Sequence, residues 1–261
     1  MLVSIPIKLP RKAIRKAVLW SVQKLYYSID RANMNGRDLT ESLDDKIMGD
    51  LACVAVWSYL YKLSIVDCIV YDEIRKDNFN FPDPGWDIAI KSKDVEVDVE
   101  SMDINLIQQE FTVLSIKSSR LPRTDTIEQA ILKRDFKIFN LSGDIEKDIT
   151  ADIEVQVYYK YVESQLGNRL INKEQVDIIL NNLDNADIYL DDIINALSLE
   201  QRWGECWLVG FKHKEAIVAE NASLRYKTWS SFGKNMWISP LKTGLPLEEL
   251  SDFVKIKNIN N

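Results

Sequence analysis

The chain has 261 residues, of which 46% are hydrophobic and 28% charged, as in globular rather than disordered proteins. No apolar run approaches the length needed to span a bilayer, and charges interrupt the N-terminal stretch where a signal peptide needs its apolar core. Three cysteines in apolar surroundings (Cys53, Cys68 and Cys206) have no metal-ligand spacing. We therefore expect a cytoplasmic protein with buried free thiols and no membrane partner.

The formal net charge of −7 is unevenly distributed along the chain. Residues 174–200 contain seven acidic and no basic residues, so the rest of the chain is formally neutral. Residues 1–37 contain eight basic residues and one aspartate, and residues 114–140 carry a charge of +3. These two basic regions could meet phosphates, although a solvated helix face is the plain alternative for the first of them.

The apolar pattern of the first 160 residues predicts both helices and strands. Helical spacing predicts helices over residues 11–30 and 38–64, the second one buried, with Thr40 or Ser42 as candidate N-caps. A capped helix over 124–139 should run toward a short strand. β-branched and alternating runs predict strands over residues 65–71, 87–90, 95–100, 110–118 and 151–161.

The remainder of the chain begins with an acidic amphipathic segment, residues 173–199, which predicts one helix or a helix pair. A strand over 206–211, a short helix over 213–220, a last strand over 236–241 and a helical turn at 246–250 should follow. We expect one α/β domain over residues 1–261. Its core should span about 39–160 and 203–240, with the acidic segment, about 173–200, as an insertion.

The sequence excludes several common chemistries. His213 is the only histidine and no nucleophile motif accompanies it, which argues against a Ser-His-Asp or Cys-His pair. The glycine-rich loops that bind nucleotides and the spacing of zinc ligands are both absent from the sequence. Chemistry based on carboxylates and lysine remains.

Asp87 opens one predicted strand, while Ser115 and Lys117 share one face of a later strand because side chains alternate with a period of two. If these strands pair, an aspartate and an ammonium meet at one edge of a sheet. Mg²⁺ prefers carboxylate and carbonyl oxygens and water, and a lysine beside a bound water can assist its attack on a phosphodiester. The plain alternative is that Asp87 caps a turn after Pro84-Gly85.

At these residues the chain resembles the PD-(D/E)xK nuclease superfamily, which includes most type II restriction endonucleases. Asp87 matches the first acid of that pattern, Ser115-Ile116-Lys117 matches its acid-x-Lys element, and Asp50 matches an acid on the preceding helix. Pro82-Asp83 matches the name-giving pair literally, but we favour Asp87 because it begins a strand. The resemblance covers roughly residues 45–160.

The resemblance implies a restriction-endonuclease-like fold, in which helices flank a mixed central sheet, and a Mg²⁺-dependent endonuclease that cuts double-stranded DNA as a homodimer. It implies metal binding by Asp87, Asp50 and the Ile116 carbonyl, with Lys117 activating the attacking water. Residues after the motif would contact the DNA backbone, as most protein–DNA hydrogen bonds do. These are Ser118, Ser119, Arg120 and Arg123, for which an ordinary polar loop is the alternative.

One departure from the family pattern leaves the function open. Ser115 stands where the family has its second acid, so one metal ligand is missing; Gln156, which shares a strand face with Glu154, is a candidate replacement. A nuclease-like fold that has lost an acid and only binds nucleic acid or protein is therefore a second hypothesis. A third is an assembly protein that uses the acidic helices as its interface.

Overall fold

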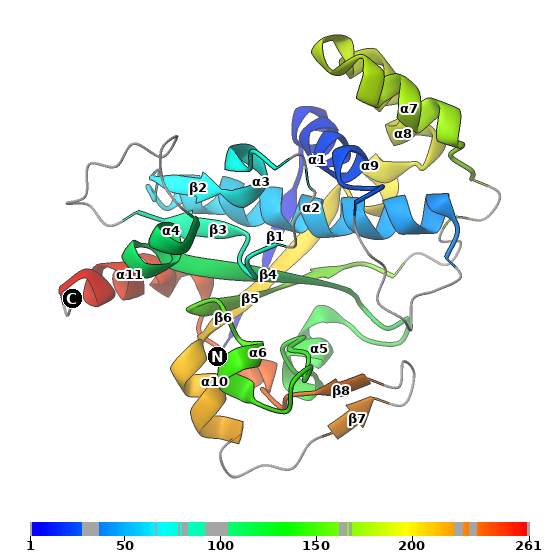
Figure 1. Cartoon of the computed structure of the whole chain (residues 1–261). Helices are drawn as coiled ribbons and strands as arrows, with labels where there is room; N and C mark the ends of the chain where they lie inside the picture. The colour runs from blue at the N-terminus through cyan, green and yellow to red at the C-terminus, as the bar shows by residue number, and fades with distance from the viewer. Residues whose placement is uncertain are drawn as a thin grey trace.

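The computed structural model describes residues 2–27, 37–65, 67–77, 79, 83–91, 104–161, 166, 169–221, 227–229 and 234–259. Its centre is a six-stranded mixed sheet with the strand order β1-β6-β5-β4-β3-β2, and helices lie on both faces of the sheet (Figure 1). Strands β4 and β5 run parallel, and the other four pairs of neighbours run antiparallel. The predicted α/β class with a mixed sheet is confirmed.

The strands of the sheet are β1 (Ile5–Lys8), β2 (Cys68–Val70), β3 (Ile88–Ile90), β4 (Thr112–Arg120), β5 (Ile153–Tyr159) and β6 (Glu205–His213), and a separate hairpin pairs β7 (Lys227–Trp229) with β8 (Lys234–Met236). The helices are α1 (Arg11–Gln23), α2 (Leu39–Lys62), α3 (Tyr71–Ile74), α4 (Ile104–Glu110), α5 (Ile127–Lys133), α6 (Ile145–Asp148), α7 (Lys173–Asn181), α8 (Asp187–Ala196), α9 (Leu199–Arg202), α10 (Lys214–Asn221) and α11 (Leu250–Ile259).

Most of the predicted elements are present, and the differences have local causes. Helix α2 begins after Asp38, which forms a capping box with Glu41, so neither Thr40 nor Ser42 is the N-cap. The acidic segment forms the helix pair α7 and α8. Elements that were not predicted include β1, α3, α4, α6, α9 and β7, and of the strand expected over residues 236–241 only Met236 is in a strand, at the end of β8. The strand expected over residues 95–100 lies outside the described residues.

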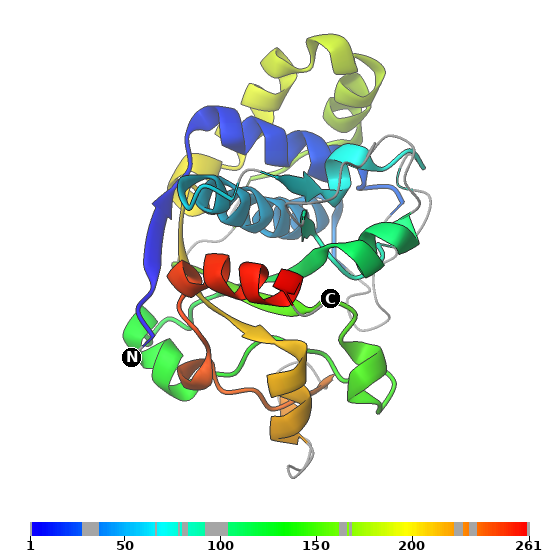
Figure 2. The same ribbon diagram turned by 90° about the vertical axis from the view of Figure 1, so that its left-hand side faces the viewer.

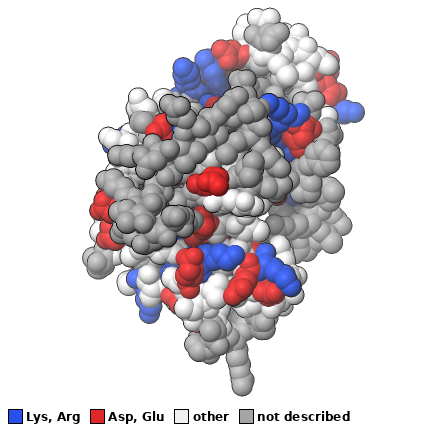
Figure 3. Space-filling model, turned by 60° about the vertical axis from the view of Figure 1, so that its left-hand side comes forward, with Lys and Arg blue, Asp and Glu red and all other residues white. Residues whose placement is uncertain are grey.

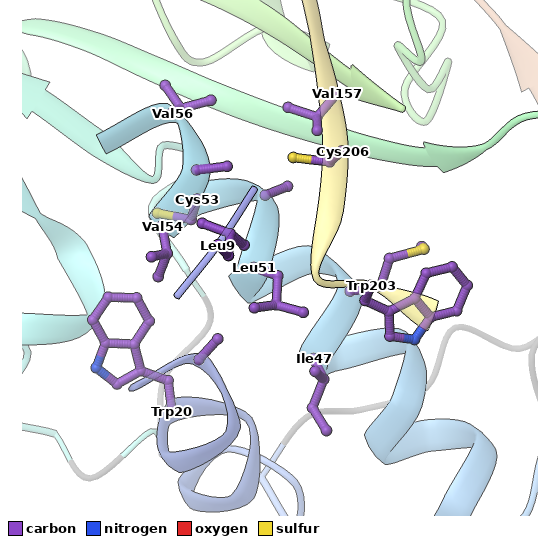
Figure 4. Packing of buried hydrophobic residues seen from close by; sticks show 14 of the residues in the cluster. Leu9, Trp20, Ile47, Leu51, Cys53, Val54, Val56, Val157, Trp203 and Cys206 are labelled. Carbon is purple, nitrogen blue, oxygen red and sulfur yellow. The ribbon is translucent and has the colours of Figure 1, made fainter. Parts of the chain in front are cut away.

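One face of the sheet packs against the long helices. Leu114 of β4 and Ile153, Val155 and Val157 of β5 join the buried side chains of α1 and α2 in the largest apolar cluster of the described residues. Figure 4 shows side chains of α1, α2, β5 and β6 meeting in this cluster. Because alternate residues of a strand point to opposite faces, the intervening residues of β4 and β5 face the other way.

The opposite face of the sheet carries two smaller apolar clusters with polar side chains between them. Trp86, Ala89 and Val113 belong to one cluster, and Tyr158 and Val209 belong to the other. On β4 and β5 the residues between these clusters are polar, and we call them the polar strip: Ser115, Lys117, Glu154 and Gln156. Neighbouring positions on β4 and β5 bring Ser115 beside Glu154 and Lys117 beside Gln156.

The acidic helix pair packs on the basic N-terminal helix. Figure 2 shows α1 between α2 and the α7–α8 pair. Arg11 Nε lies 3.1 Å and Arg15 Nε 2.8 Å from Asp191 Oδ1, and Arg11 also contacts Glu200 at 2.9 Å. The basic charge of α1 is therefore partly matched inside the molecule. Arg11 and Arg15 thus have internal partners, which neither alternative for this basic region predicted.

No helix in the described part of the chain is long and apolar enough to cross a membrane.

Candidate active site

Asp87 lies where β3 begins beside β4, as the sequence predicts. Its backbone N–H donates to the Leu114 carbonyl at 2.8 Å, and its carboxylate Oδ2 accepts from the Ile116 N–H at 2.6 Å. Burial raises the pKa of Asp87, while the Lys117 ammonium and the Ile116 N–H oppose the rise. Asp87 is thus an acid of the site, close enough to Lys117 to be affected by its charge.

Glu154 lies beside Ser115, the residue that stands where the resembled family has its second acid. It lies on β5 directly beside Ser115 of β4, and its residue is only 3% exposed. Its Oε2 atom is buried and has no hydrogen-bond partner, although Lys117 Nζ lies 3.9 Å away. A buried carboxylate oxygen without a partner is costly to folding, which makes Glu154 a candidate for a role other than stability.

The charges of the site act on one another. Burial raises the pKa of Glu154 to about 7; the Lys117 ammonium and the Ser115 hydroxyl oppose the rise, and the Asp87 carboxylate adds to it. Two carboxylates and one ammonium therefore share a partly buried site, with Lys117 about a third exposed. Such a site favours a cation, because a cation removes the repulsion between the two carboxylates.

The residues present suit a small divalent cation. In an extended strand the N–H and C=O of one residue point to the same side, so the Ile116 carbonyl faces the edge where Asp87 binds the Ile116 N–H. Within the described residues, no group of three or more His, Cys, Asp or Glu side chains could hold a metal. A cation here would therefore bind Asp87, Glu154, the Ile116 carbonyl and water, a set that suits Mg²⁺.

Asp50 is engaged elsewhere than the sequence predicts. Although it is buried on α2, its carboxylate accepts from the Ser21 hydroxyl and pairs with the Lys24 ammonium. Lys24 also lies 2.8 Å from Asp72. Burial raises the pKa of Asp50, and the charge of Lys24 opposes the rise. With its partner already a lysine, Asp50 has a structural explanation for its burial, and we no longer assign it to the metal.

Gln156 does not supply the missing ligand. The residue is fully buried, and its amide is used by the backbone around it. Its Nε2 donates to the Lys117 carbonyl at 3.0 Å and the Val157 carbonyl at 3.0 Å, and its Oε1 accepts from the Lys137 N–H at 3.1 Å. Gln156 therefore fixes the strand positions of the site, and its amide is already engaged by the surrounding backbone.

The four predicted DNA-binding residues have different surroundings. Arg120 pairs with Asp45 at 2.6 Å and lies 3.5 Å from Asp44, so it links the end of β4 to the start of α2. Ser118 and Ser119 are half-buried on β4, and Arg123 is exposed in the loop that follows. The partners of Arg120 account for its position, Ser119 Oγ accepts from Gln156 Nε2 at 3.4 Å, and a role of the four residues in binding DNA stays a prediction.

The surface does not present a separate basic area on the face shown in Figure 3. The described Lys and Arg side chains there lie next to Asp and Glu side chains.

Glu154 is the residue that sequence reasoning noted without assigning. The signal was its alternation with Gln156 on a predicted strand, but its position beside Ser115 depends on the parallel register of β4 and β5. Strand register is set by pairing partners that are distant in the sequence, so the contact could not be derived from the strand alone.

Comparisons with known proteins do not place the chain in a family. No family model matches it, and no solved structure matches it. The chain is similar to the pre-mRNA-splicing factor CEF1 of Debaryomyces hansenii, with 28% identity over 151 residues, which cover 54% of this chain and 21% of that protein. The chain thus matches about a fifth of the length of that relative.

Proposed function

We propose that the protein is a metal-dependent nuclease with a restriction-endonuclease-like fold, which hydrolyses phosphodiester bonds of double-stranded DNA with Mg²⁺. The observation that supports this most is the buried, unpartnered Glu154 oxygen beside Ser115 and 3.9 Å from Lys117. Glu154 on the neighbouring strand takes the part of the acid that Ser115 replaces. In this proposal the acid and the lysine of the acid-x-Lys element come from two neighbouring strands, Glu154 from β5 and Lys117 from β4. Asp87, at the start of β3, is the first acid of the family pattern.

Each residue has a defined part in this proposal. Asp87 and Glu154, with the Ile116 carbonyl, would hold the cation, which supplies positive charge to the scissile phosphate and lowers the pKa of a bound water. Lys117 lies beside Glu154, so its ammonium is positioned to donate to the attacking water or to a phosphate oxygen as negative charge develops there. Hydrolysis joins the water oxygen to phosphorus as that water releases a proton to solvent, and it breaks the bond from phosphorus to the sugar oxygen, which takes up a proton from solvent.

The Ile116 N–H orients Asp87 through its bond to Oδ2, which leaves Oδ1 of the same carboxylate for a cation. Gln156 anchors the Lys117 carbonyl, so the strand that carries the lysine has a fixed position. One such site cuts one strand, and we therefore expect a homodimer to cut both strands of a duplex.

Plasmid cleavage tests the proposal. The wild-type protein should nick or linearise supercoiled DNA with Mg²⁺ or Mn²⁺ and not with EDTA. Glu154→Gln, Asp87→Asn and Lys117→Ala should each lose at least about a hundredfold in rate, as expected when one group that contacts the transition state is removed. Asp50→Asn serves as the comparison, because its carboxylate pairs with Lys24.

Cleavage that persists in Glu154→Gln would disprove the site assigned here. A specific observation favours a second function: Ser115 stands on β4 where the family pattern has an acid, so this strand offers no carboxylate beside Lys117. Salt-dependent DNA binding by the wild type, with no cleavage at any metal concentration, would support a nuclease-like fold that only binds nucleic acid.

A further inference from the structure

We infer that the outer face of α8 is a docking surface for a basic amphipathic helix of another protein. The acidic segment of residues 174–200 is a part of the sequence that the proposed nuclease does not use. In the structure its helices α7 and α8 lie beyond α1, which separates them from α2 (Figure 2). The proposed function does not enter this inference, because the helix pair and the candidate active site lie on different elements.

Helix α8 has an inner face that the protein itself covers. Leu190, Ile193 and Ile194 are buried in the largest apolar cluster of the described residues. Beside them, Asp191 binds Arg11 and Arg15 of α1. These contacts account for the apolar spacing of α8 and for Asp191, and they leave the opposite face of the helix on the outside of the molecule.

The outer face of α8 exposes apolar side chains that are close together in the sequence. Ile188 is 74% exposed, more than any other large apolar side chain in the described part of the chain. Tyr189 is 37% exposed, and Leu183, in the turn before α8, is 44% exposed. Single exposed apolar residues are ordinary on a protein surface, whereas exposed apolar residues that cluster are typical of interaction sites. We call these three side chains the apolar patch.

Two carboxylates border the apolar patch. Ile188 and Asp192 lie one helical turn apart, and Asp187 directly precedes Ile188. Asp187 and Asp192 are exposed, and neither forms an ion pair with any residue that the structure describes. Residues 174–200 contain no Lys or Arg, so the segment itself cannot neutralise these acids. The outer face of α8 therefore combines exposed apolar side chains with negative charge.

This charge decides which partner fits the apolar patch. A second copy that docked through a two-fold axis would bring the same surface of both chains together and place like charges side by side. The phosphates of a nucleic acid would be repelled as well. A helix of another protein with apolar residues on one face can cover Ile188 and Tyr189, and Lys or Arg residues beside that face can pair with Asp187 and Asp192. Charge complementarity thus favours a basic amphipathic helix.

Fluorescence anisotropy with two labelled peptides tests this choice of partner. The first is a helical peptide of about 15 leucine and lysine residues with its leucines on one face, and the second has glutamate in place of lysine. The wild-type protein should bind the lysine peptide at least about tenfold more tightly than the glutamate peptide, because only lysine is attracted to the two carboxylates. Binding of the lysine peptide should weaken as salt rises.

Variants of α8 and α5 locate the binding. Ile188→Ser should weaken binding of the lysine peptide about five- to tenfold, since it removes the apolar side chain that the leucines cover. Asp187→Asn/Asp192→Asn should weaken it by a similar factor at low salt and remove much of its salt dependence. Glu128→Gln/Leu132→Ser should change neither value. It is the matched control, because it changes an exposed acid and an exposed leucine one turn apart on α5.

Three results would overturn the inference. The first is an equal affinity of wild type and both α8 variants for the lysine peptide, because the peptide then binds elsewhere. The second is wild-type protein that binds the two peptides equally or binds neither. The third is a dimer in sedimentation velocity that Ile188→Ser dissociates, which would assign the apolar patch to a second copy. Thermal midpoints equal to that of wild type establish that the variants fold, and if one variant unfolds, the other still tests the patch.

Discussion

The environment of Glu154 does not favour folding. It is buried on a central strand, one of its oxygens has no partner, and its pKa rises to about 7 chiefly because of burial. The folded protein therefore holds a proton on Glu154 between its ordinary pKa, about 4.5, and about 7, whereas the unfolded chain releases it. The resulting stability is fully present at low pH and is lost as the pH rises to about 7.

Glu154→Gln should therefore stabilise the protein at neutral pH while it abolishes cleavage. Glutamine resembles the protonated acid at every pH, so the variant should exceed the wild type by about 3 kcal/mol in unfolding free energy at pH 8 and by little at pH 4.5. Urea unfolding at both values measures this difference. Glu110→Gln, which changes an exposed side chain, is the matched control. A gap between Glu154→Gln and wild type that is the same at both pH values would contradict the prediction.

Part of the site could be predicted at the level of single residues. Asp87 and Lys117 were selected because each begins or ends an apolar run, and the structure brings them close enough for their charges to interact. Asp50 was selected because it matches an acid on the helix before the motif, and Arg120 because it follows the motif. Their partners, Lys24 and Asp45, come from elements whose packing the sequence does not state.

Among the elements, α2 and α9 are joined by a buried ion pair. Asp44 of α2 is 1% exposed, and it accepts from both terminal nitrogens of Arg202 at 2.8 and 2.7 Å and from the Trp203 indole at 2.8 Å. The pair connects the helix behind the sheet to the segment that leads into β6. Removing the acid would leave Arg202 buried without its carboxylate partner.

Asp44→Ala should therefore destabilise the protein by about 3–5 kcal/mol. Asp45→Ala, which removes the neighbouring but partly exposed acid, should cost about 1 kcal/mol or less. Urea denaturation of both variants measures the difference. The double variant Asp44→Leu/Arg202→Met should lose less than the sum of the single changes, because neither charge is then left unpaired; simple additivity would count against the pair.

Helices α1 and α8 are connected by a second set of ion pairs, which is partly exposed. Asp191 binds Arg11 and Arg15, and these pairs lower its pKa below the ordinary value. Asp191→Asn should destabilise the protein by about 1 kcal/mol at low salt and by less at 1 M NaCl, since salt screens exposed pairs. Thermal midpoints at the two salt concentrations measure the effect. A loss independent of salt would assign the contact to packing instead.

Elements with strong local signals were the ones that the sequence predicted well. Helix α2 has a capping box and a long apolar run, and β5 has β-branched residues at regular spacing. Strand β1 was missed because its four residues pair with β6, about 200 positions away, and the stretch Ile5–Lys8 has little local preference of its own. The order of strands in the sheet likewise depends on contacts between distant residues.

At the scale of the whole molecule, binding of a cation should raise the thermal stability of the protein. A ligand that binds the folded state at a hundred times its Kd adds about 2.7 kcal/mol, which for a chain of this size is a rise of several degrees in Tm. Mg²⁺ should raise the Tm of the wild type and not that of Asp87→Asn or Glu154→Gln. The rise should be larger at pH 8 than at pH 6, because the cation must displace the proton of Glu154.

Scanning calorimetry with MgCl₂, and with NaCl of equal ionic strength, measures this effect. An equal Mg²⁺-induced rise in all three proteins would mean that the cation binds elsewhere. The net charge of −7 does not indicate where a cation would bind, because the acidic residues of α7 and α8 offset the basic residues of α1. The charge of the candidate site depends on its own few ionisable side chains.

The pairing of the chain's first and later parts also sets a sequence of events during synthesis. Strand β1 needs β6, and α1 needs the acidic helices, so the first 23 residues leave the ribosome long before their partners at positions 177–213 exist. At about 5–20 residues per second this wait lasts about 10–40 s. During that time a nascent chain exposes an amphipathic, positively charged N-terminal segment that the finished protein covers.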